Sequence, residues 1–208
     1  MSSNKLVLIG GGGHCMSVLD SLLNGKCQRF EDIVIVDRPE NVGKEIIGIK
    51  IKVSDDQLVE LFSKGYHYAF ITVGSIKTTA KRRELWFAAR NIGYQFVNII
   101  DPTAIISPTV HLGTGIFVGK SVVINSGVTI GDMAIINTGA IVEHGCSVGP
   151  FCHIAVGGVL CGGVCVEQDC FIGANATIIQ DEHISPSTVI PAGALVKHSK
   201  LYLPHLVL

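Results

Sequence analysis

The chain of 208 residues is poor in charge, and its two signs nearly balance. Only 16% of the residues are Asp, Glu, Lys or Arg, against 48% hydrophobic residues, and the formal net charge is −1 at pH 7. Such a composition argues against disorder and against a basic or acidic tail. It also provides no global field that would attract a nucleic acid or an anionic membrane. Any anionic ligand must therefore be bound locally.

The sequence also lacks long hydrophobic runs and paired cysteine motifs. No segment reaches the ~18 consecutive apolar residues of a membrane-spanning helix, and the apolar run after Lys5 is too short for a signal peptide. The seven cysteines form an odd set without a C-x-x-C pair, which disfavours a disulfide framework and a structural zinc site. A reducing, cytoplasmic location fits best. The cysteines are Cys15, Cys27, Cys146, Cys152, Cys161, Cys165 and Cys170.

Residues 1–100 alternate strand-like and helix-like patterns. Strands that alternate with helices form a parallel sheet with helices on its faces, so this half predicts a small Rossmann-like α/β domain. Helical periodicity stops around Asp101-Pro102, and we place the domain boundary there. The expected strands are 5–9, 32–37, 69–73 and 95–100, and the expected helices are about 13–23, 55–63 and 78–91.

An internal repeat of six residues occupies most of the remaining chain. Every sixth residue from Ile106 to Val196 is aliphatic, and the position four residues later is usually small or medium-sized. If about a third of residues are Ile, Leu or Val, sixteen consecutive matches arise by chance roughly once in ten million trials or less. Glycine often follows the aliphatic position, as at Gly113, Gly131 and Gly149, and we expect it to supply the positive φ of a turn.

Three such hexads form one triangular coil of 18 residues, so residues 106–196 provide about five coils stacked ~4.8 Å apart. The pattern indicates a hexapeptide parallel β-helix over 101–197, followed by a tail at 198–208. In this register Cys146, Cys152 and Cys170 face the core as small apolar residues.

Glu143 and His144 are the sharpest anomaly of the repeat. Glu143 is the only formally charged residue between Met133 and Val166. Because Val142 faces the core, the pair lies at a corner from which a histidine can project outward. An uncharged surround favours the neutral imidazole that a general base needs. A histidine that merely caps the turn is the alternative.

A glycine-rich turn, Gly10 to Gly13 followed by His14, comes after the first strand. Glycines allow close approach of a phosphate, and a helix N-terminus offers unpaired N–H groups. The complete G-x-G-x-x-G fingerprint is absent because Cys15 stands at the third glycine, and Asp37 ends the second strand where an acid can accept ribose hydroxyls. The turn favours a mononucleotide such as UDP or CMP over NAD. A tight turn without a ligand is the alternative.

Several segments together resemble the family of sialic-acid O-acetyltransferases (NeuD) and UDP-amino-sugar N-acetyltransferases (PglD). They are GGGGH after the first strand, VGS at 73–75, NIIDPTAIISPTVHLGTGIFVGK at 98–120 and INTGAIVEHGCSVG at 136–149. The resemblance spans about residues 5–197. It implies a left-handed β-helix assembled as a homotrimer, with active sites between subunits, acetyl-CoA as co-substrate and no metal.

The resemblance also implies roles for individual residues. His144 matches the catalytic base, oriented by Glu143 or by a backbone carbonyl, and His153 falls beside the acetyl thioester. The positions that would line the cofactor groove are Gly162, Ala174 and Ala192. The residues that would bind the nucleotide sugar are Gly12, Gly13, His14, Asp37 and Gly74, with Asn137 near the acceptor group.

The sequence departs from the family pattern at three places. Gly145 stands where amine-acetylating members carry an acid after the base, Arg38 stands where they carry a second Asp, and the tail from 198 lacks the usual ending. The expected reaction is acetyl transfer to the amino group of a nucleotide-linked amino sugar in surface-glycan or sialic-acid-type biosynthesis, by direct attack with His144 as base. O-acetylation of sialic acid or a precursor is the alternative, because EHG resembles that branch.

Two further alternatives belong to other classes of protein. The chain could be a nucleotide-sugar-binding scaffold without catalysis. It could also resemble γ-type carbonic anhydrases, with His111, His144 and His153 on zinc, although the glycine-rich domain would then have no role.

Overall fold

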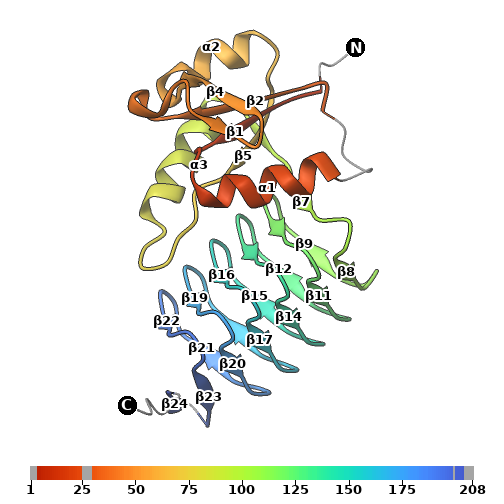
Figure 1. Ribbon diagram of the computed structural model, residues 1–208. Coiled ribbons are helices and arrows are strands. Elements are labelled where there is room, and N and C mark those ends of the chain that lie inside the picture. Colours follow the sequence, from red (N-terminus) through yellow and green to blue (C-terminus); the bar gives the residue numbers. More distant parts are fainter. Residues whose placement is uncertain (1–3, 25–29, 199, 204–208) are drawn as a thin grey trace. The chain divides into compact units, whose positions relative to one another are not determined.

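The computed structural model describes residues 4–24, 30–198 and 200–203 (Figure 1). The chain divides into two compact units, residues 1–74 with 80–102 and residues 75–79 with 103–208. The first is an α/β unit and the second is a β-helix, which is the fold class that the sequence predicted. The short segment 75–79 belongs to the second unit. Among the described residues, no helix is long and apolar enough to cross a membrane.

The α/β unit is built on a sheet centred on β1 (Lys5–Ile9). Strand β1 pairs in parallel with β2 (Asp32–Asp37) on one side and β5 (Tyr68–Ile71) on the other. Its residues from Leu6 to Ile9 are at most 1% exposed, which is the continuous apolar run expected of a parallel strand covered on both faces. The full strand order is β3-β4-β2-β1-β5-β6, with β3 (Glu45–Ile46), β4 (Ile49–Ser54) and β6 (Gln95–Phe96).

The helices of this unit follow the predicted order with shifted boundaries. They are α1 (Gly13–Asn24), α2 (Leu58–Ser63) and α3 (Ala80–Ile92), with short 3-10 turns η1 (Pro39–Asn41) and η2 (Asp55–Gln57). The expected helix at 55–63 is therefore a 3-10 turn followed by α2. The antiparallel β3–β4 hairpin was not predicted, and the expected strand at 95–100 is two strands, β6 and β7 (Ile99–Ile100).

The β-helix consists of short strands, one in each hexad, of two residues each except for the three-residue β23. The bounds are β8 (Ile105–Ile106), β9 (His111–Leu112), β10 (Phe117–Val118), β11 (Val123–Ile124), β12 (Thr129–Ile130), β13 (Ile135–Ile136), β14 (Ile141–Val142), β15 (Ser147–Val148), β16 (His153–Ile154), β17 (Val159–Leu160), β18 (Cys165–Val166), β19 (Phe171–Ile172), β20 (Thr177–Ile178), β21 (His183–Ile184), β22 (Val189–Ile190) and β23 (Leu195–Lys197). From β8 to β20, each strand pairs in parallel with the strand 18 residues later, as Ile124 does with Val142. The strands stack into three walls (Figure 1).

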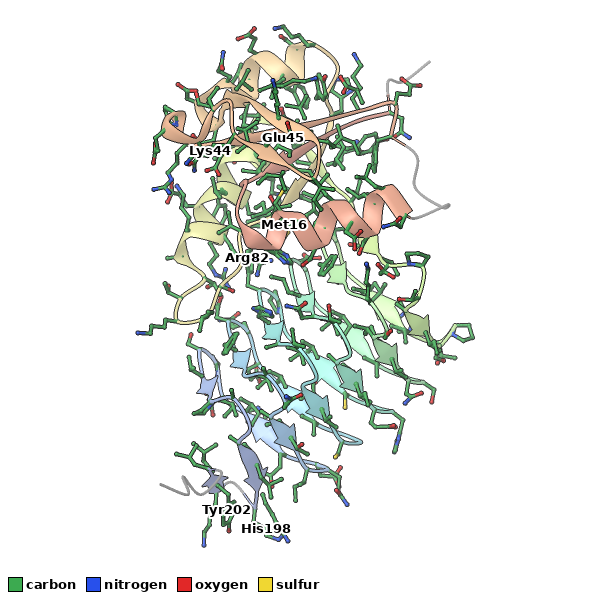
Figure 2. The ribbon with its side chains drawn as sticks, viewed as in Figure 1. Met16, Lys44, Glu45, Arg82, His198 and Tyr202 are labelled. Carbon is green, nitrogen blue, oxygen red and sulfur yellow. The ribbon has the colours of Figure 1, made fainter. Side chains whose placement is uncertain are left out.

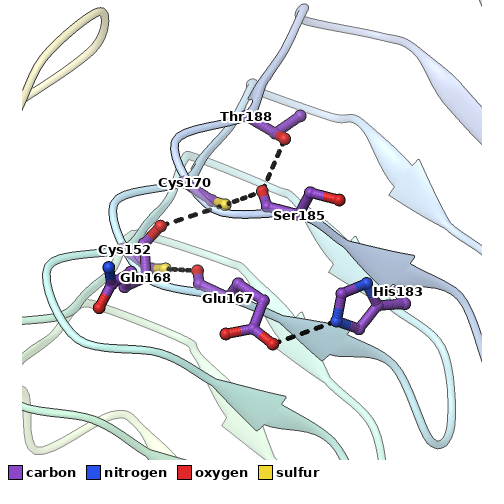
Figure 3. Close-up of polar contacts among 7 residues, drawn as sticks. All are labelled: Cys152, Glu167, Gln168, Cys170, His183, Ser185 and Thr188. Atoms are coloured by element: carbon purple, nitrogen blue, oxygen red, sulfur yellow. Dashed lines mark hydrogen bonds and ion pairs between the residues drawn. The ribbon is translucent and has the colours of Figure 1, made fainter.

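The interior of the β-helix is the predicted aliphatic ladder. Every aliphatic position from Val118 to Val196 is at most 5% exposed, and Ile106 and Leu112 at the first end are partly buried. The predicted core cysteines Cys146, Cys152 and Cys170 are at most 1% exposed. Each thiol donates to a backbone carbonyl of the following coil, at 3.1, 2.8 and 3.1 Å respectively, and Figure 3 shows the bonds of Cys152 and Cys170. The cysteine side chains therefore fill space in the core, and their thiols supply hydrogen bonds to backbone carbonyls of the following coil.

The position of the turns differs from the sequence expectation. Positive φ occurs at every sixth residue from Gly115 to Gly193, three residues after the aliphatic position rather than directly after it. The glycines directly after the aliphatic position have a different role, because a Cβ on Gly149 would lie 2.6 Å from the Gln168 nitrogen and one on Gly173 would lie 2.4 Å from the Ala192 nitrogen. Glycine is needed there because the backbone of the next coil passes so close.

The last strand reverses direction. Strand β24 (Lys200–Tyr202) pairs antiparallel with β23 and so covers part of its open edge. His198, with φ of 51°, directly follows β23, and Tyr202 is the last residue of β24 (Figure 2). Of the predicted tail at 198–208, residues 199 and 204–208 lie outside the described residues, as does Cys27. The six described cysteines form no disulfide.

Candidate active site

One corner of the β-helix carries the predicted catalytic pair. Strand β14 ends at Val142, which is fully buried, and the chain then turns through Glu143, His144 and Gly145 before β15. Gly145 has φ of 69°, and its N–H donates to the Ser126 carbonyl at 3.0 Å. Because the turn is fixed by this bond to the preceding coil, the side chain of His144 points outward and is 72% exposed.

Glu143 holds the His144 imidazole. Its Oε2 atom accepts a hydrogen bond from the His144 backbone N–H and lies 3.2 Å from the ring atom Nδ1. The hydrogen bond with the His144 side chain holds the pKa of Glu143 below its ordinary value, so the group is a carboxylate. A carboxylate only accepts, so Nδ1 carries the proton and Nε2 of the neutral ring presents its lone pair.

The other face of the His144 ring lies over the next coil. A Cβ added to Gly162, 18 residues later, would lie 2.7 Å from both Cε1 and Nε2 of His144. Glycine is therefore what lets the ring lie against that corner. The hollow at this corner has a volume of about 540 Å³, and its lining residues are His144, Gly145, Gly162, Gly163, Gln180 and Asp181.

Sequence reasoning found His144 and Gly162 but missed Gln180 and Asp181. The signal for them is the register itself, because residues 18 and 36 positions after the His144–Gly145 pair occupy the same corner. Backbone bonds confirm this stacking, since the Gly163 N–H donates to the His144 carbonyl at 2.9 Å and the Asp181 N–H to the Gly162 carbonyl at 3.0 Å.

Asn137 and His153 meet on another wall of the β-helix. The Asn137 Oδ1 atom accepts the Thr138 N–H at 2.8 Å, so its amide nitrogen faces Nε2 of His153 at 3.2 Å. His153 is 9% exposed, and its Nδ1 donates to the Ser75 carbonyl at 2.9 Å. Both ring nitrogens are thus engaged and the neutral tautomer with Nδ1–H is fixed. A place for His153 beside a thioester stays a prediction.

The remaining predicted cofactor residues lie at a different corner. Ala174 and Ala192 are 18 residues apart, and the Gly193 N–H donates to the Ala174 carbonyl at 2.8 Å. Ala192 is exposed and Ala174 half-buried. Within one chain, therefore, Gly162 lies with His144, whereas the two alanines form a separate corner stack.

The glycines of the turn in the α/β unit are of two kinds, those that the fold requires and those that border open space. Gly10 has φ of 111°, and a Cβ on Gly11 would lie 2.5 Å from Cδ1 of Ile51, so both glycines are required by the fold. Gly12 and Gly13 face open space, with nothing within 4 Å of an added Cβ. Helix α1 begins at Gly13, so its N-terminal end, with the positive end of the helix dipole, borders the same space.

This space is a pocket of about 420 Å³. All five residues predicted for the nucleotide-sugar site line it, namely Gly12, Gly13, His14, Asp37 and Gly74. Asp37 fixes the turn, because Oδ2 accepts the Gly11 N–H at 2.8 Å and Oδ1 accepts the Arg38 N–H at 2.7 Å. The charged groups of the lining are Asp37, Arg38, Asp55 and Lys81.

Sequence reasoning missed Asp55 and Lys81 in this pocket. Asp55 directly follows β4, and Lys81 lies in the first turn of α3, after β5. Both therefore follow the carboxyl end of a parallel strand, which is the edge where ligands bind in open α/β sheets. That rule is the signal that could have found them.

The three histidines of the carbonic anhydrase alternative do not form a metal site. In the described part of the chain, the group of His, Cys, Asp and Glu side chains close enough to share an ion is Cys165, Glu167 and His183. His111, His144 and His153 form no such group, and His153 is held by Asn137 and Ser75. The geometry therefore does not support that alternative.

Known proteins resemble the chain in both units. Residues 5–85 match PglD_N, the PglD N-terminal domain. PerB from Caulobacter crescentus, solved with CoA and GDP-perosamine, is 32% identical over 92% of each chain, with a TM-score of 0.61. A histidine-to-alanine variant of GDP-perosamine N-acetyl transferase from Caulobacter crescentus, solved with the same two ligands, is 28% identical over 97% of each chain, with a TM-score of 0.69.

The acetyltransferase domain of PglB from Neisseria gonorrhoeae is 25% identical over 96% of this chain and 98% of that chain, with a TM-score of 0.69. The similarity covers 92% or more of this chain in each of the three comparisons, so it extends over both units. By sequence identity and fold together, the chain belongs to the PglD and NeuD family of hexapeptide-repeat acyltransferases and is an acyltransferase.

Proposed function

We propose that the protein transfers the acetyl group of acetyl-CoA to the amino group of a nucleotide-linked amino sugar. The observation that carries the proposal is the state of His144, whose Nδ1 is held by the Glu143 carboxylate while Nε2 lies exposed over Gly162. A base oriented in this way can accept a proton from a reacting amine. Solved relatives bound to CoA and GDP-perosamine support the two substrate classes.

The reaction needs one base and no covalent enzyme intermediate. The acceptor amine attacks the thioester carbon, Nε2 of His144 takes the amine proton, and the C–S bond then breaks as the tetrahedral intermediate collapses. The imidazolium returns the proton to the CoA thiolate. Glu143 stabilises the transient positive charge on the ring, and the backbone of Gly162 is our candidate for contacting the oxyanion. Cys146 and Cys152 are buried and are not nucleophiles in this scheme.

The acceptor's nucleotide is proposed to bind in the pocket of the α/β unit. The open space above Gly12 and Gly13 lets a diphosphate approach the first turn of α1. Arg38 and Lys81 supply positive charge to the same pocket, and Asp37 and Asp55 supply acceptors for sugar or base groups. We keep His14 and Gly74 in this site as lining residues, and Asn137 as a residue near the acceptor.

We further propose a homotrimer with the CoA groove between subunits. The expected cofactor residues are divided between two corners of one triangular coil, which supports this assembly. Gly162 lies with His144, whereas Ala174 and Ala192 stack at another corner of the same chain. A second copy, laid beside the first, brings the alanine corner of one chain to the His144 corner of the next.

A second candidate is O-acetylation of sialic acid or a precursor. The observation in its favour is Gly145, which leaves the histidine without an acidic residue on its C-terminal side, as in the EHG pattern of that branch. In this reaction a hydroxyl replaces the amine, and His144 takes its proton in the same way.

The experiment that tests the proposal is a panel of acceptors incubated with protein and acetyl-CoA while free thiol is followed. UDP-, CMP-, GDP- and dTDP-linked amino sugars form one arm, and free sialic acids form the other. We expect thiol release with a nucleotide-linked amino sugar and an acetamide product by mass spectrometry. Thiol release with non-nucleotide sialic acids alone would instead establish the O-acetyltransferase.

A further inference from the structure

A wall of the β-helix carries three metal-ligating side chains of three different kinds. The thiol of Cys165, the carboxylate of Glu167 and the imidazole of His183 offer ligand atoms that all lie within 4.8 Å of one another. None of the three lines the hollow at His144 or the pocket of the α/β unit. The proposed acetyl transfer gives them no role.

Backbone register holds these side chains on one face. Cys165 on β18 and His183 on β21 are paired residues of neighbouring coils. Val166 points into the core with 1% exposure, so Cys165 and Glu167, on either side of it, both point outward. The Cys165 N–H donates to the Glu182 carbonyl and the Glu167 N–H to the Ile184 carbonyl, each at 2.9 Å, and these two bonds bracket His183.

The side chains are already drawn together and remain accessible. Nε2 of His183 lies 3.1 Å from Oε1 of Glu167. Figure 3 shows the two side chains directed at each other, Glu167 from the residue after β18 and His183 from β21. Their side chains are 56% and 44% exposed, so an ion can reach them from solvent. The gap between the imidazole and the carboxylate matches the separation of two ligands on one ion of ordinary size, given bond lengths of about 2.0 to 2.2 Å.

We propose that Cys165, Glu167 and His183 form a binding site for a zinc ion, separate from the acetyl-transfer site. A thiolate, an imidazole and a carboxylate suit Zn²⁺ and similar transition metals, whereas Mg²⁺ and Ca²⁺ require shells of oxygen ligands. Three protein ligands leave the fourth tetrahedral position for water. Binding replaces the thiol proton of Cys165 with the metal, and that proton goes to the buffer.

The site connects two successive coils near the C-terminal end of the β-helix. Ligands from β18 and β21 on one ion fix these coils to each other, so zinc is expected to stabilise the folded state against the unfolded chain, in which the ligands are apart. The effect is therefore on stability, and turnover measured with the folded protein is expected to be the same with and without zinc.

The test uses the full chain, stripped of metal by a chelator and titrated with Co²⁺ as a coloured substitute for Zn²⁺. We expect one equivalent of Co²⁺ per chain, with the near-ultraviolet absorption of a thiolate–cobalt bond and the visible bands of a four-coordinate ion, all displaced by Zn²⁺. Cys165→Ser is expected to abolish the thiolate band. Zn²⁺ is expected to raise the Tm of the wild-type chain and to leave that of Cys165→Ser unchanged.

Two matched variants control for other ligands. Cys161→Ser removes a half-buried thiol four residues before Cys165, and His111→Asn removes an exposed imidazole from the same wall. Both variants are expected to bind Co²⁺ as the wild-type chain does. Glu167→Gln and His183→Asn keep the thiol and are expected to weaken binding at least tenfold. Absence of a thiolate band in the wild-type chain, or its persistence in Cys165→Ser, would overturn the proposal. Acetyl transfer is scored separately, so neither result depends on it.

Discussion

Nδ1 of His144 lies 3.2 Å from Oε2 of Glu143, the residue directly before it in the chain. The same oxygen also accepts the backbone N–H of His144, so the carboxylate is fixed relative to the corner as well as to the ring. In this family member the partner of the histidine thus precedes it, while Gly145 on the other side shapes the turn. The imidazole is therefore oriented from its N-terminal side.

The first prediction concerns Glu143→Ala. The substitution removes the acceptor that fixes the His144 tautomer, and the imidazole keeps its position over Gly162 but loses its orientation. We expect kcat to fall about tenfold, the equivalent of about 1.4 kcal/mol, which is the size of one hydrogen bond to a charged group. The KM for acetyl-CoA is expected to change little. Steady-state kinetics at saturating acceptor test this, and an unaltered kcat would show that Glu143 does not orient the base.

The second prediction separates the two halves of the glycine turn. Gly12→Ala places a methyl group in open space, so the free energy of unfolding is expected to stay within about 0.5 kcal/mol. The methyl group occupies the volume proposed for the diphosphate, so the KM for the nucleotide sugar is expected to rise about tenfold while the KM for acetyl-CoA stays the same.

The matched control for this prediction is Gly11→Ala. Its Cβ would lie 2.5 Å from the buried Ile51 side chain and 3.0 Å from Oδ2 of Asp37, so we expect a loss of about 1 to 3 kcal/mol in folding stability. Denaturant unfolding measures both variants. An unstable Gly12→Ala, or one with an ordinary KM for the nucleotide sugar, would place the ligand elsewhere.

The third prediction tests the two kinds of glycine in the coils. A Cβ on Gly173 would lie 2.4 to 2.7 Å from backbone atoms of residues 190–192, and backbone cannot rotate away, so Gly173→Ala is expected to cost about 3 kcal/mol. Gly139 has φ of 68° but open space around it, and Asn175 occupies the same corner two coils later with φ of 54°. Gly139→Asn is therefore expected to cost less than about 1 kcal/mol. Thermal unfolding measures both variants, and equal losses of stability in Gly173→Ala and Gly139→Asn would refute the distinction between the two kinds of glycine.

The fourth prediction concerns alkaline pH. Burial raises the pKa of the Cys15 thiol to about 11, from an ordinary value of 9.0. As pH rises, the unfolded chain therefore loses the Cys15 proton before the folded chain does. The buried neutral thiol makes its full contribution to the free energy of unfolding below pH 9. That contribution falls by roughly 2 to 3 kcal/mol as pH rises through about 11. Tyr66 and Tyr94, whose pKa values burial raises to about 12, add a later loss.

Cys15→Ala provides the control for the alkaline profile. Denaturant unfolding at a series of pH values is expected to show a flatter decline in this variant between pH 9 and 11. A thiol reagent at pH 8 is expected to modify the half-buried Cys161 and Cys165 of the native chain, and to reach Cys15 only after unfolding. Rapid labelling of Cys15 in the native state would contradict the burial that underlies the prediction.

The repeat could be predicted because burial acts on every hexad in the same way. A β-helix whose interior has room for one aliphatic side chain per hexad leaves a six-residue ladder in the sequence, and the ladder fixes which residues face inward. The turns could not be placed as well, because their positive φ positions include Met133, Phe151 and Asp169 besides glycines. Glycine itself is also used where the next coil passes close, so its presence does not identify the turn.

The candidate site, like the repeat, could be predicted only in part from the sequence. Glu143 and His144 stood out by charge, and the register placed them at a corner. Asp181 and Gln180 join them only through the stacking of coils, which the six-residue spacing implies but which carries no chemical signal of its own. The β3–β4 hairpin was missed because each of its strands depends on pairing within the sheet more than on a distinct pattern of its own.

The most direct test of the account is the kcat of His144→Ala with acetyl-CoA and a nucleotide-linked amino sugar. The side chain is exposed, so the variant is expected to fold and to bind CoA as the wild-type chain does, and His111→Ala serves as the matched exposed histidine. We expect kcat to fall at least about a hundredfold in His144→Ala and to stay the same in His111→Ala. Unchanged turnover in a folded His144→Ala protein would contradict it.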